Sequence, residues 1–167
     1  MDLSRNRQSP PSEPRTRVTQ GAAGHPITEV CLHTSATTAR WWQGKTAAQM
    51  RDEIRRWHMA APLKWRDIGY HFVVAPDGTW ANGRALSVIG AGVAGRNQGV
   101  VHICMVPITD VLRISRFDDW YTRAQRDSVK ALIRDIRAKT DLARVTGHNQ
   151  FANKLCPGFR VVSEDWL

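Results

Sequence analysis

The chain is predicted to fold as a single α/β domain in which strands alternate with two helices. Three observations support this fold class: apolar runs rich in β-branched residues, two stretches with the periodicity of amphipathic helices, and a globular composition. Of the 167 residues, 42% are hydrophobic and 23% are charged, so the chain can bury a sizeable core. No run has the apolar length of a membrane helix, and we expect no membrane span.

Residues 1–24 are expected to form a disordered basic tail, and residues 25–167 are expected to form the folded domain. The tail is rich in Arg, Ser, Pro, Gln and Gly and offers few apolar side chains for burial. It also lacks the apolar middle region of a secretory signal. We therefore expect the protein to be made and kept in the cytoplasm.

The first predicted strand is an apolar run over residues 29–33 that ends in a histidine. Small hydroxylated residues follow it, so His33 is expected at the end of a buried strand. A helix is predicted to begin after Thr46, because Thr46-Ala47-Ala48-Gln49 has the form of a capping box. The buried face of this helix is expected to consist of residues at helical spacing. They are Met50, Ile54 and Trp57.

A hairpin and a glycine-rich loop are predicted next. Residues 70–74 have the β-branched and aromatic character of a strand, and Asp77-Gly78 is a strong turn signal before a second strand through Trp80. The glycine-rich stretch over residues 89–95 lacks the lysine and the strand-to-helix context of a phosphate-binding loop. It is predicted to be a loop near the pocket.

The second half of the chain repeats the pattern of strand and helix. Residues 100–106 are almost continuously apolar, as in a strand that is covered on both faces. A second capping box at Thr122-Arg123-Ala124-Gln125 predicts a helix that ends near Lys139. Its inner stripe is expected to be Val129, Leu132, Ile133 and Ile136.

A metal site is predicted from three residues that lie far apart in the sequence. The loop over residues 147–159 contains His148 and Cys156, and His33 is the best third ligand. Zinc prefers nitrogen and sulfur ligands in a tetrahedron, and a catalytic zinc keeps three protein ligands and one water, whose pKa it lowers to about 7. Cys31 is the rival ligand, whereas Cys104 is expected to be a small buried hydrophobe.

Two further side chains are candidates for assisting catalysis at such a metal. Lys154 lies two residues before Cys156, so in an extended backbone the two side chains point to the same side. An oxyanion that develops on an attacked carbonyl needs such donors aimed at it. Tyr70 is the second candidate. Taken alone, Tyr70 would be a core tyrosine and Lys154 a solvated loop lysine.

Four motifs along roughly residues 27–167 together resemble one known family. They are His33-Thr34-Ser35-Ala36-Thr37, then Ile68-Gly69-Tyr70-His71-Phe72-Val73-Val74 with Asp77-Gly78, then Gly147-His148, and finally Lys154-Leu155-Cys156-Pro157-Gly158-Phe159. Their order and spacing are similar to those of the zinc N-acetylmuramoyl-L-alanine amidases of the phage lysozyme type, which are relatives of the peptidoglycan recognition proteins.

This resemblance implies both a fold and a reaction. The fold would be a central mixed β-sheet flanked by helices. The resemblance implies a Zn²⁺ ion bound by His33, His148 and Cys156, with catalytic assistance from Tyr70 and Lys154. The reaction would be hydrolysis of the amide bond between the lactyl group of N-acetylmuramic acid and L-alanine in peptidoglycan. The expected setting is a phage or prophage endolysin that acts on the cell wall after release.

The sequence also differs from the family pattern at two coupled positions. The family usually has a small residue at the strand position of His102 and often a histidine at the loop position of Gly92. We hypothesise that the imidazole of His102 replaces the missing one in space, near the substrate or the zinc ligands. The alternative is a buried neutral histidine with a backbone partner. Asn149-Gln150 and Arg160 are further departures, which bear on how the ligands are oriented.

The net charge of +9 predicts a surface that attracts anions. The expected partners are peptidoglycan and anionic envelope polymers; nucleic acid is not expected, and we expect a monomer. One alternative function is a non-catalytic peptidoglycan-binding module on the same fold, against which the retained Tyr70, Lys154 and Cys156 argue. Another is a regulatory protein that binds a polymerase through its basic face, for which residues 1–24 offer no specific motif.

Overall fold

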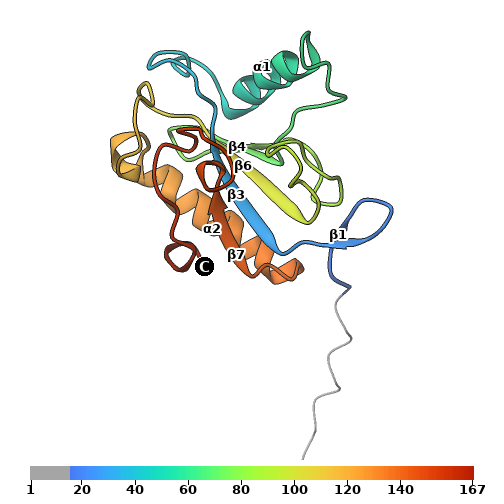
Figure 1. The fold of residues 1–167 in the computed structure, drawn as a ribbon. Helices are drawn as coiled ribbons and strands as arrows, with labels where there is room; N and C mark the ends of the chain where they lie inside the picture. Colours follow the sequence, from blue (N-terminus) through green and yellow to red (C-terminus); the bar gives the residue numbers. More distant parts are fainter. Residues whose placement is uncertain (1–15) are drawn as a thin grey trace, which may run out of the picture.

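The protein is built around a mixed five-stranded β-sheet (Figure 1). The computed structural model describes residues 16–167, so the first part of the predicted tail lies outside the described residues. The strands follow the order β5-β4-β6-β3-β7, and only the edge strand β5 is antiparallel to its neighbour. They span Glu29–Thr34 (β3), Phe72–Val74 (β4), Trp80–Asn82 (β5), Val100–Met105 (β6) and Arg144–Gly147 (β7). The predicted α/β class and mixed sheet are confirmed.

Residues 16–24, predicted as part of the tail, are ordered. Thr19–Gln20 (β1) pairs with His25–Pro26 (β2) in a short antiparallel ladder. The Gln20 side chain is fully buried, where its amide donates to the Val100 carbonyl at 3.0 Å and accepts from the Gly99 N–H at 2.9 Å. These bonds satisfy a buried polar side chain that was expected to lie in an exposed tail. The folded part of the chain therefore begins before residue 25.

The helices α1 (Ala47–Met59) and α2 (Arg123–Lys139) begin at the two predicted capping boxes. Three short 3₁₀ segments, Phe117–Asp119 (η1), His148–Gln150 (η2) and Ser163–Asp165 (η3), complete the helical structure of the described residues. Within residues 16–167, no helix is long and apolar enough to cross a bilayer. The expectation that Trp57 is buried was wrong: its side chain is 41% exposed and lies 5.3 Å from the Trp41 ring, because the buried stripe of α1 ends at Ile54.

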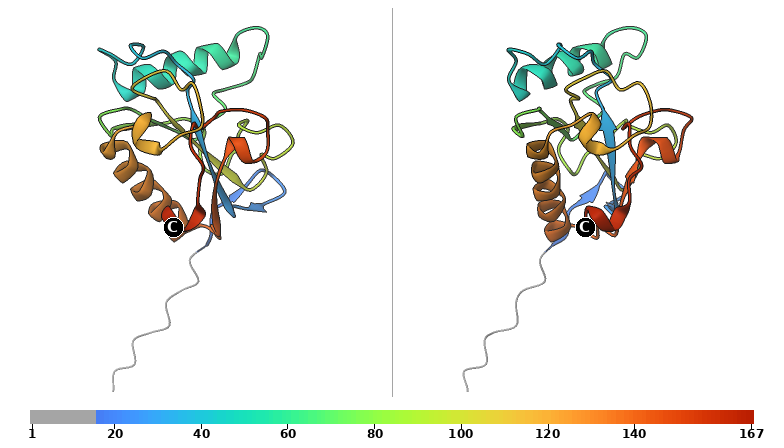
Figure 2. Two further views of the ribbon diagram at one scale, coloured as in Figure 1. Left: turned by 60° about the vertical axis from the view of Figure 1, so that its left-hand side comes forward. Right: turned by 90° about the vertical axis from the view of Figure 1, so that its left-hand side faces the viewer.

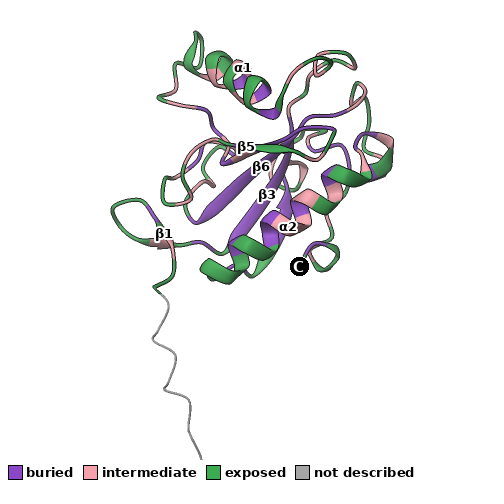
Figure 3. Ribbon diagram, turned by 180° about the vertical axis from the view of Figure 1, so that it is seen from behind, coloured by how far each residue is buried: buried purple, intermediate pink, exposed green. Residues whose placement is uncertain are grey.

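The two faces of the sheet are covered by different elements (Figures 2 and 3). The predicted inner stripe of α2 packs on one face, against alternate residues such as Leu32 of β3 and Ile103 of β6. The opposite face carries α1, which packs against β4 and β5. Since successive side chains of a strand point to opposite faces, Cys31, His33 and His102 face away from α2. Cys31 and the two buried histidines of the sheet therefore lie on the same face.

Strand β7 brings two distant segments of the chain side by side. It is short and was not predicted, yet it pairs in parallel with β3 in the register Glu29↔Arg144 to Leu32↔Gly147. The residue after β7 is His148, which this register places beside His33 of β3.

Candidate metal centre and active site

The structure brings together the three residues predicted to bind a metal. His33 lies at the end of β3 and is 1% exposed, whereas His148 in η2 and Cys156 in the following loop are half-buried. Their potential ligand atoms all lie within 4.8 Å of one another. The Sγ atom of Cys156 is 3.7 Å from Nδ1 of His33, and the rings of His33 and His148 are 5.0 Å apart.

The spacing of this cluster fits a tetrahedral zinc. With Zn–N bonds near 2.0–2.1 Å and a Zn–S bond near 2.3 Å, a tetrahedral angle places the nitrogen and sulfur ligands about 3.6 Å apart. The 3.7 Å between His33 Nδ1 and Cys156 Sγ matches this separation. Two imidazoles and one thiolate leave the fourth position for water or substrate, as in catalytic zinc sites.

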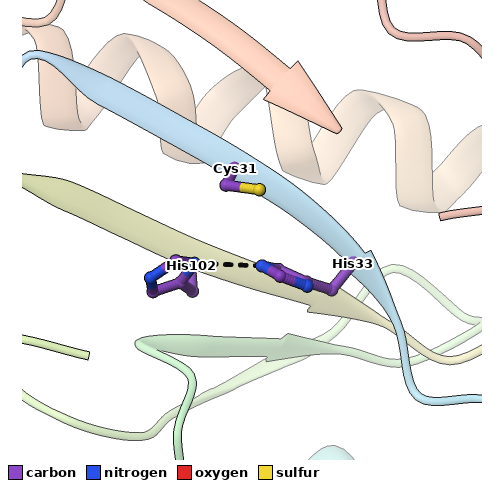
Figure 4. Close-up of side chains that lie close together, drawn as sticks. All are labelled: Cys31, His33 and His102. Carbon is purple, nitrogen blue, oxygen red and sulfur yellow. Dashed lines mark hydrogen bonds between the residues drawn. The ribbon is translucent and has the colours of Figure 1, made fainter. Parts of the chain in front are cut away.

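A second group, formed by Cys31, His33 and His102, also has its donor atoms within 4.8 Å (Figure 4). Here the two nitrogens, His33 Nε2 and His102 Nδ1, are 3.0 Å apart, which is a hydrogen-bond distance. Two nitrogens on one tetrahedral zinc would be about 3.3 Å apart. All three residues are fully buried, and burial raises the pKa of the Cys31 thiol to about 12. The rival ligand Cys31 is therefore less suited to a metal than Cys156.

The electrostatics of the cluster keep its imidazoles neutral. Burial, followed by the neighbouring His102, lowers the pKa of His33 well below its ordinary value. Burial and then Lys154 lower the pKa of His148. Burial raises the pKa of the Cys156 thiol to about 11, opposed by the Thr34 N–H that donates to Sγ at 3.2 Å and by Lys154. A metal must therefore displace the thiol proton when it binds.

Tyr70 lies beside the cluster, with its ring 5.2 Å from that of His33. Burial raises the pKa of its hydroxyl well above the ordinary value. His58, near the end of α1, packs its ring 5.3 Å from that of Tyr70 and accepts the Gly69 N–H at 2.9 Å. A Cβ at Gly69 would overlap the Ala91 carbonyl, so the segment that presents Tyr70 is closely confined.

Lys154 is exposed and lines two hollows that border the cluster. One hollow, of about 400 Å³, contains Cys156 and Asp110; the other, of about 420 Å³, contains His148 and Gly92, in the loop predicted to lie near the pocket. Lys154 therefore borders both hollows, next to Cys156 in one and to His148 in the other.

The ligand loop is held by backbone contacts. The Asn149 N–H donates to the Cys156 carbonyl at 2.8 Å, which ties the two ligand segments together. Tyr121 donates its hydroxyl to the Pro157 carbonyl at 2.7 Å. The two family departures, Asn149 and Gln150, bond backbone groups of the same loop: the Asn149 amide donates to the Phe159 carbonyl, and Gln150 accepts the Gly147 N–H. Both side chains brace the loop.

The ring of His102 lies beside the cluster, with its Nδ1 3.0 Å from Nε2 of His33, as the hypothesis requires. The ring is also buried, and burial lowers its pKa to about 3, so it is neutral as in the alternative; among the described residues its hydrogen bond is to His33 and not to the backbone. That His102 replaces the imidazole missing at Gly92 stays a prediction. The sequence signal for this contact was weak, since only the departure at Gly92 and His102 pointed to it.

The mixed sheet, a His/Cys cluster that is compatible with a metal ion, and the hollows beside the cluster fit a hydrolase. The chain belongs to the N-acetylmuramoyl-L-alanine amidase family, whose model matches residues 23–159.

Known proteins with similar sequences include phage endolysins. The endolysin of Escherichia phage T7 is 36% identical over 107 residues, which cover 64% of this chain and 68% of the relative. The endolysin of Klebsiella phage KP32 is 31% identical over 131 residues, or 78% and 80% of the two chains.

Solved structures support the same fold. Drosophila PGRP-LB aligns with a TM-score of 0.68 at 24% identity, covering 87% of this chain and 81% of that one. The N-acetylmuramoyl-L-alanine amidase LysC from Clostridium intestinale aligns with a TM-score of 0.61 at 24% identity, covering 86% and 84%.

Proposed function

We propose that this protein is an endolysin of the phage type that hydrolyses the bond between N-acetylmuramic acid and L-alanine in peptidoglycan, with zinc held by His33, His148 and Cys156. Membership of the amidase family and the similarity to phage endolysins support the reaction. The observation that carries the metal assignment is the 3.7 Å spacing of His33 Nδ1 and Cys156 Sγ beside two open hollows.

In this proposal His33, His148 and Cys156 would hold a zinc ion, which would supply polarisation of a water molecule and of the scissile carbonyl. The side chains of the protein supply hydrogen-bond donors and orient the substrate. Lys154 directs an ammonium toward the carbonyl oxygen, on which negative charge develops during attack. Tyr70 stays protonated, since burial raises the pKa of its hydroxyl, and it can donate a hydrogen bond to the same oxygen or to the bound water. Water adds across the amide, which gives a lactyl carboxylate and an amino group on L-alanine.

The substrate class follows from the family and from the shape of the site. A polymer with sugar and peptide parts on opposite sides of the scissile bond needs space on both sides of the metal. The hollow beside Cys156 and the hollow beside His148 provide that space, with Lys154 shared between them. A solved relative, the complex of PGRP-LCa and PGRP-LCx, is bound to tracheal cytotoxin.

The test is digestion of purified sacculi by the zinc-loaded protein, followed by chemical labelling of the amino and reducing ends that are released. We expect new amino groups on L-alanine, a loss of this release with a chelator, and its return on adding zinc. New reducing sugar ends, or amino groups on crosslinking residues, would contradict the proposed bond. Binding of sacculi without release of any ends would support the non-catalytic module instead.

Cysteine variants test the ligand set within the same assay. Cys156→Ser should lose both bound zinc and the release of L-alanine amino groups, because it removes the sulfur ligand. Cys31→Ser is the matched control: it alters a cysteine two residues from His33 that belongs to the buried group, and it should keep the metal. Retention of zinc by Cys156→Ser would overturn the assignment.

A further inference from the structure

We infer that His102 is a positioning residue that holds the ring of His33 in the tautomer and orientation needed to bind the metal. This inference rests on the proposed zinc site. It concerns a side chain that would not touch metal or substrate and that acts through a metal ligand.

The two nitrogens of His33 face different neighbours. Nδ1 lies 3.7 Å from Cys156 Sγ, and Nε2 lies 3.0 Å from Nδ1 of His102 (Figure 4). A neutral imidazole has one N–H and one lone pair, and a metal ligand must offer the lone pair. If Nδ1 binds the metal, the proton of His33 is on Nε2 and points at His102. The Nδ1 atom of His102 is then the acceptor that fixes this arrangement.

The backbone of His102 is fixed by His71, the residue that precedes β4. The His102 N–H donates to Nδ1 of His71 at 2.9 Å, and the His71 N–H donates to the His102 carbonyl at 2.9 Å. Nε2 of His71 is in turn 2.8 Å from the Val88 carbonyl. The rings of His71 and His102 stack at 5.9 Å with an interplanar angle of 21°. These contacts hold the His102 ring, and with it the Nδ1 atom that accepts from His33, in a fixed position.

The ring of His102 makes no hydrogen bond that would explain its presence except the one to His33. Its Nε2 atom is buried without a hydrogen-bond partner among residues 16–167. A buried polar atom that lacks a partner destabilises the fold, and an apolar side chain of similar size would avoid that penalty. The imidazole is therefore poorly explained as a core residue and well explained as the partner of a metal ligand.

Two glycines leave the space that this ring occupies. A Cβ built at Gly92 would overlap the ring and lie 2.6 Å from Cγ of His102, and a Cβ at Gly90 would lie 2.6 Å from its Cδ2. Neither glycine has a positive φ, so each is required for space and not for backbone conformation. Gly92 also lines the hollow that contains His148 and Lys154. A side chain added at Gly92 would therefore press on the His102 ring, while His33 itself is not substituted.

The experiment measures zinc affinity by competition with a chromophoric chelator and records the absorption spectrum of the Co²⁺-substituted protein. His102→Leu keeps the volume but removes the acceptor, and we expect about 10- to 100-fold weaker zinc binding, as for other partners of metal-binding histidines. His102→Asn places an amide oxygen near the present Nδ1 position and should restore most of the affinity and the Co²⁺ spectrum. Thermal unfolding of the metal-free forms checks that the variants fold.

Gly92→Ala supplies an independent test through a double-mutant cycle. In the wild-type background its methyl group should push the His102 ring away from His33 and weaken zinc binding. In the His102→Ala background the methyl group has room, so the same substitution should have no further effect on affinity. Additive effects in the two backgrounds would mean that Gly92 does not act through His102.

The outcomes separate this inference from the proposed function. If a folded His102→Leu protein binds zinc as tightly as the wild type while Cys156→Ser does not bind it, the inference is overturned and the zinc site stands. If Cys156→Ser keeps the metal and Cys31→Ser loses it, the metal sits among Cys31, His33 and His102. In that case both the ligand set and the positioning assignment fail.

Discussion

At the scale of single residues, the three cysteines show how environment separates chemistry from packing. Cys31 and Cys104 are fully buried, and burial raises the pKa of both thiols. Cys156 is half-buried; burial raises the pKa of its thiol to about 11, but the Thr34 N–H, which donates to Sγ, and the charge of Lys154 oppose this rise. Only Cys156 combines access to solvent with groups that stabilise a thiolate.

Lys154 is predicted to act in the reaction and not in metal binding. Lys154→Met keeps the length of the side chain but removes its charge, so the oxyanion loses a donor. We expect kcat to fall by about 10²- to 10³-fold, the size seen when one such donor is removed, while zinc content stays the same. The measurements are turnover of a soluble muropeptide and metal analysis. Lys130→Met is the control, because Lys130 lines a hollow away from the cluster. An unchanged kcat would show that Lys154 is a solvated loop residue without a role in the reaction.

The residues of the site could be predicted from the sequence to different extents. His33, His148 and Cys156 were found because each lies in a motif that the family shares. The departure at Gly92 and His102 suggested that His102 lies near the predicted ligands, but its direct contact with His33 depends on the register of β3 against β6, in which Cys31 pairs with His102. The contacts of His58 with Gly69 and Tyr70 were not predicted for a similar reason. They depend on how α1 packs against the segment before β4.

At the scale of elements, the helices were predicted better than the strands. The capping boxes mark the start of α1 and α2 with local hydrogen bonds, which a sequence pattern can show. Strand β7 is short, and β1 and β2 have two residues each, so their existence depends on partners that are distant in sequence. Trp57 has the helical spacing of the buried face of α1. However, the buried residues of this helix end at Ile54, and the Trp57 side chain stays partly exposed.

The two capping boxes share one sequence pattern but differ in their tertiary contacts. Gln49 lies at the exposed start of α1. Gln125 is fully buried and donates to the Val74 and Val106 carbonyls at 3.1 and 2.7 Å, so it links α2 to the ends of β4 and β6. Loss of the Gln125 amide leaves the buried Val106 carbonyl without this donor, at about 1–3 kcal/mol. The Val74 carbonyl keeps its hydrogen bond from the Val106 N–H at 3.0 Å.

We therefore expect Gln125→Leu to lower the free energy of unfolding by several times more than Gln49→Leu. The exposed cap should cost about 1 kcal/mol or less. Urea unfolding of both variants measures the difference. Equal losses would show that the buried bridge contributes no more than an ordinary helix cap.

At the scale of the whole molecule, the sheet has a large apolar core on one face and the residues of the candidate site on the other. The face covered by α2 carries the largest apolar cluster, which includes Leu32, Ile103 and Ile133. The opposite face carries His33, His71 and His102, all buried, within a protein whose net charge is +9. The expected attraction of this charge to anionic envelope polymers stays a prediction. The histidine-rich face makes the fold sensitive to acid, because each imidazole must be neutral to remain buried.

The sign of the acid effect follows from the direction of the pKa shifts. Burial lowers the pKa of His71 to about 4 and that of His102 to about 3, and it lowers that of His33 well below the ordinary value of 6.5. The unfolded chain therefore binds more protons than the folded one below pH 6.5. The stability that these residues contribute is complete above pH 6.5 and is lost as the pH falls toward their folded values. The pKa of carboxyl groups such as Asp67 and Asp77 is lowered from its ordinary value, so they do not account for a loss of stability that begins near pH 6.5.

We predict that the free energy of unfolding of the metal-free protein falls steeply between pH 6.5 and pH 4, by up to about 1.4 kcal/mol per pH unit for each buried histidine. Urea unfolding at a series of pH values, with a chelator present, measures the slope. His71→Gln should lower stability at pH 7 but reduce the slope by the share of one histidine, because its amide does not titrate. With zinc bound, the metal competes with protons for His33 and His148, so the decline should begin at lower pH. A metal-free protein that is equally stable at pH 7 and pH 4 would show that these imidazoles reach solvent when protonated.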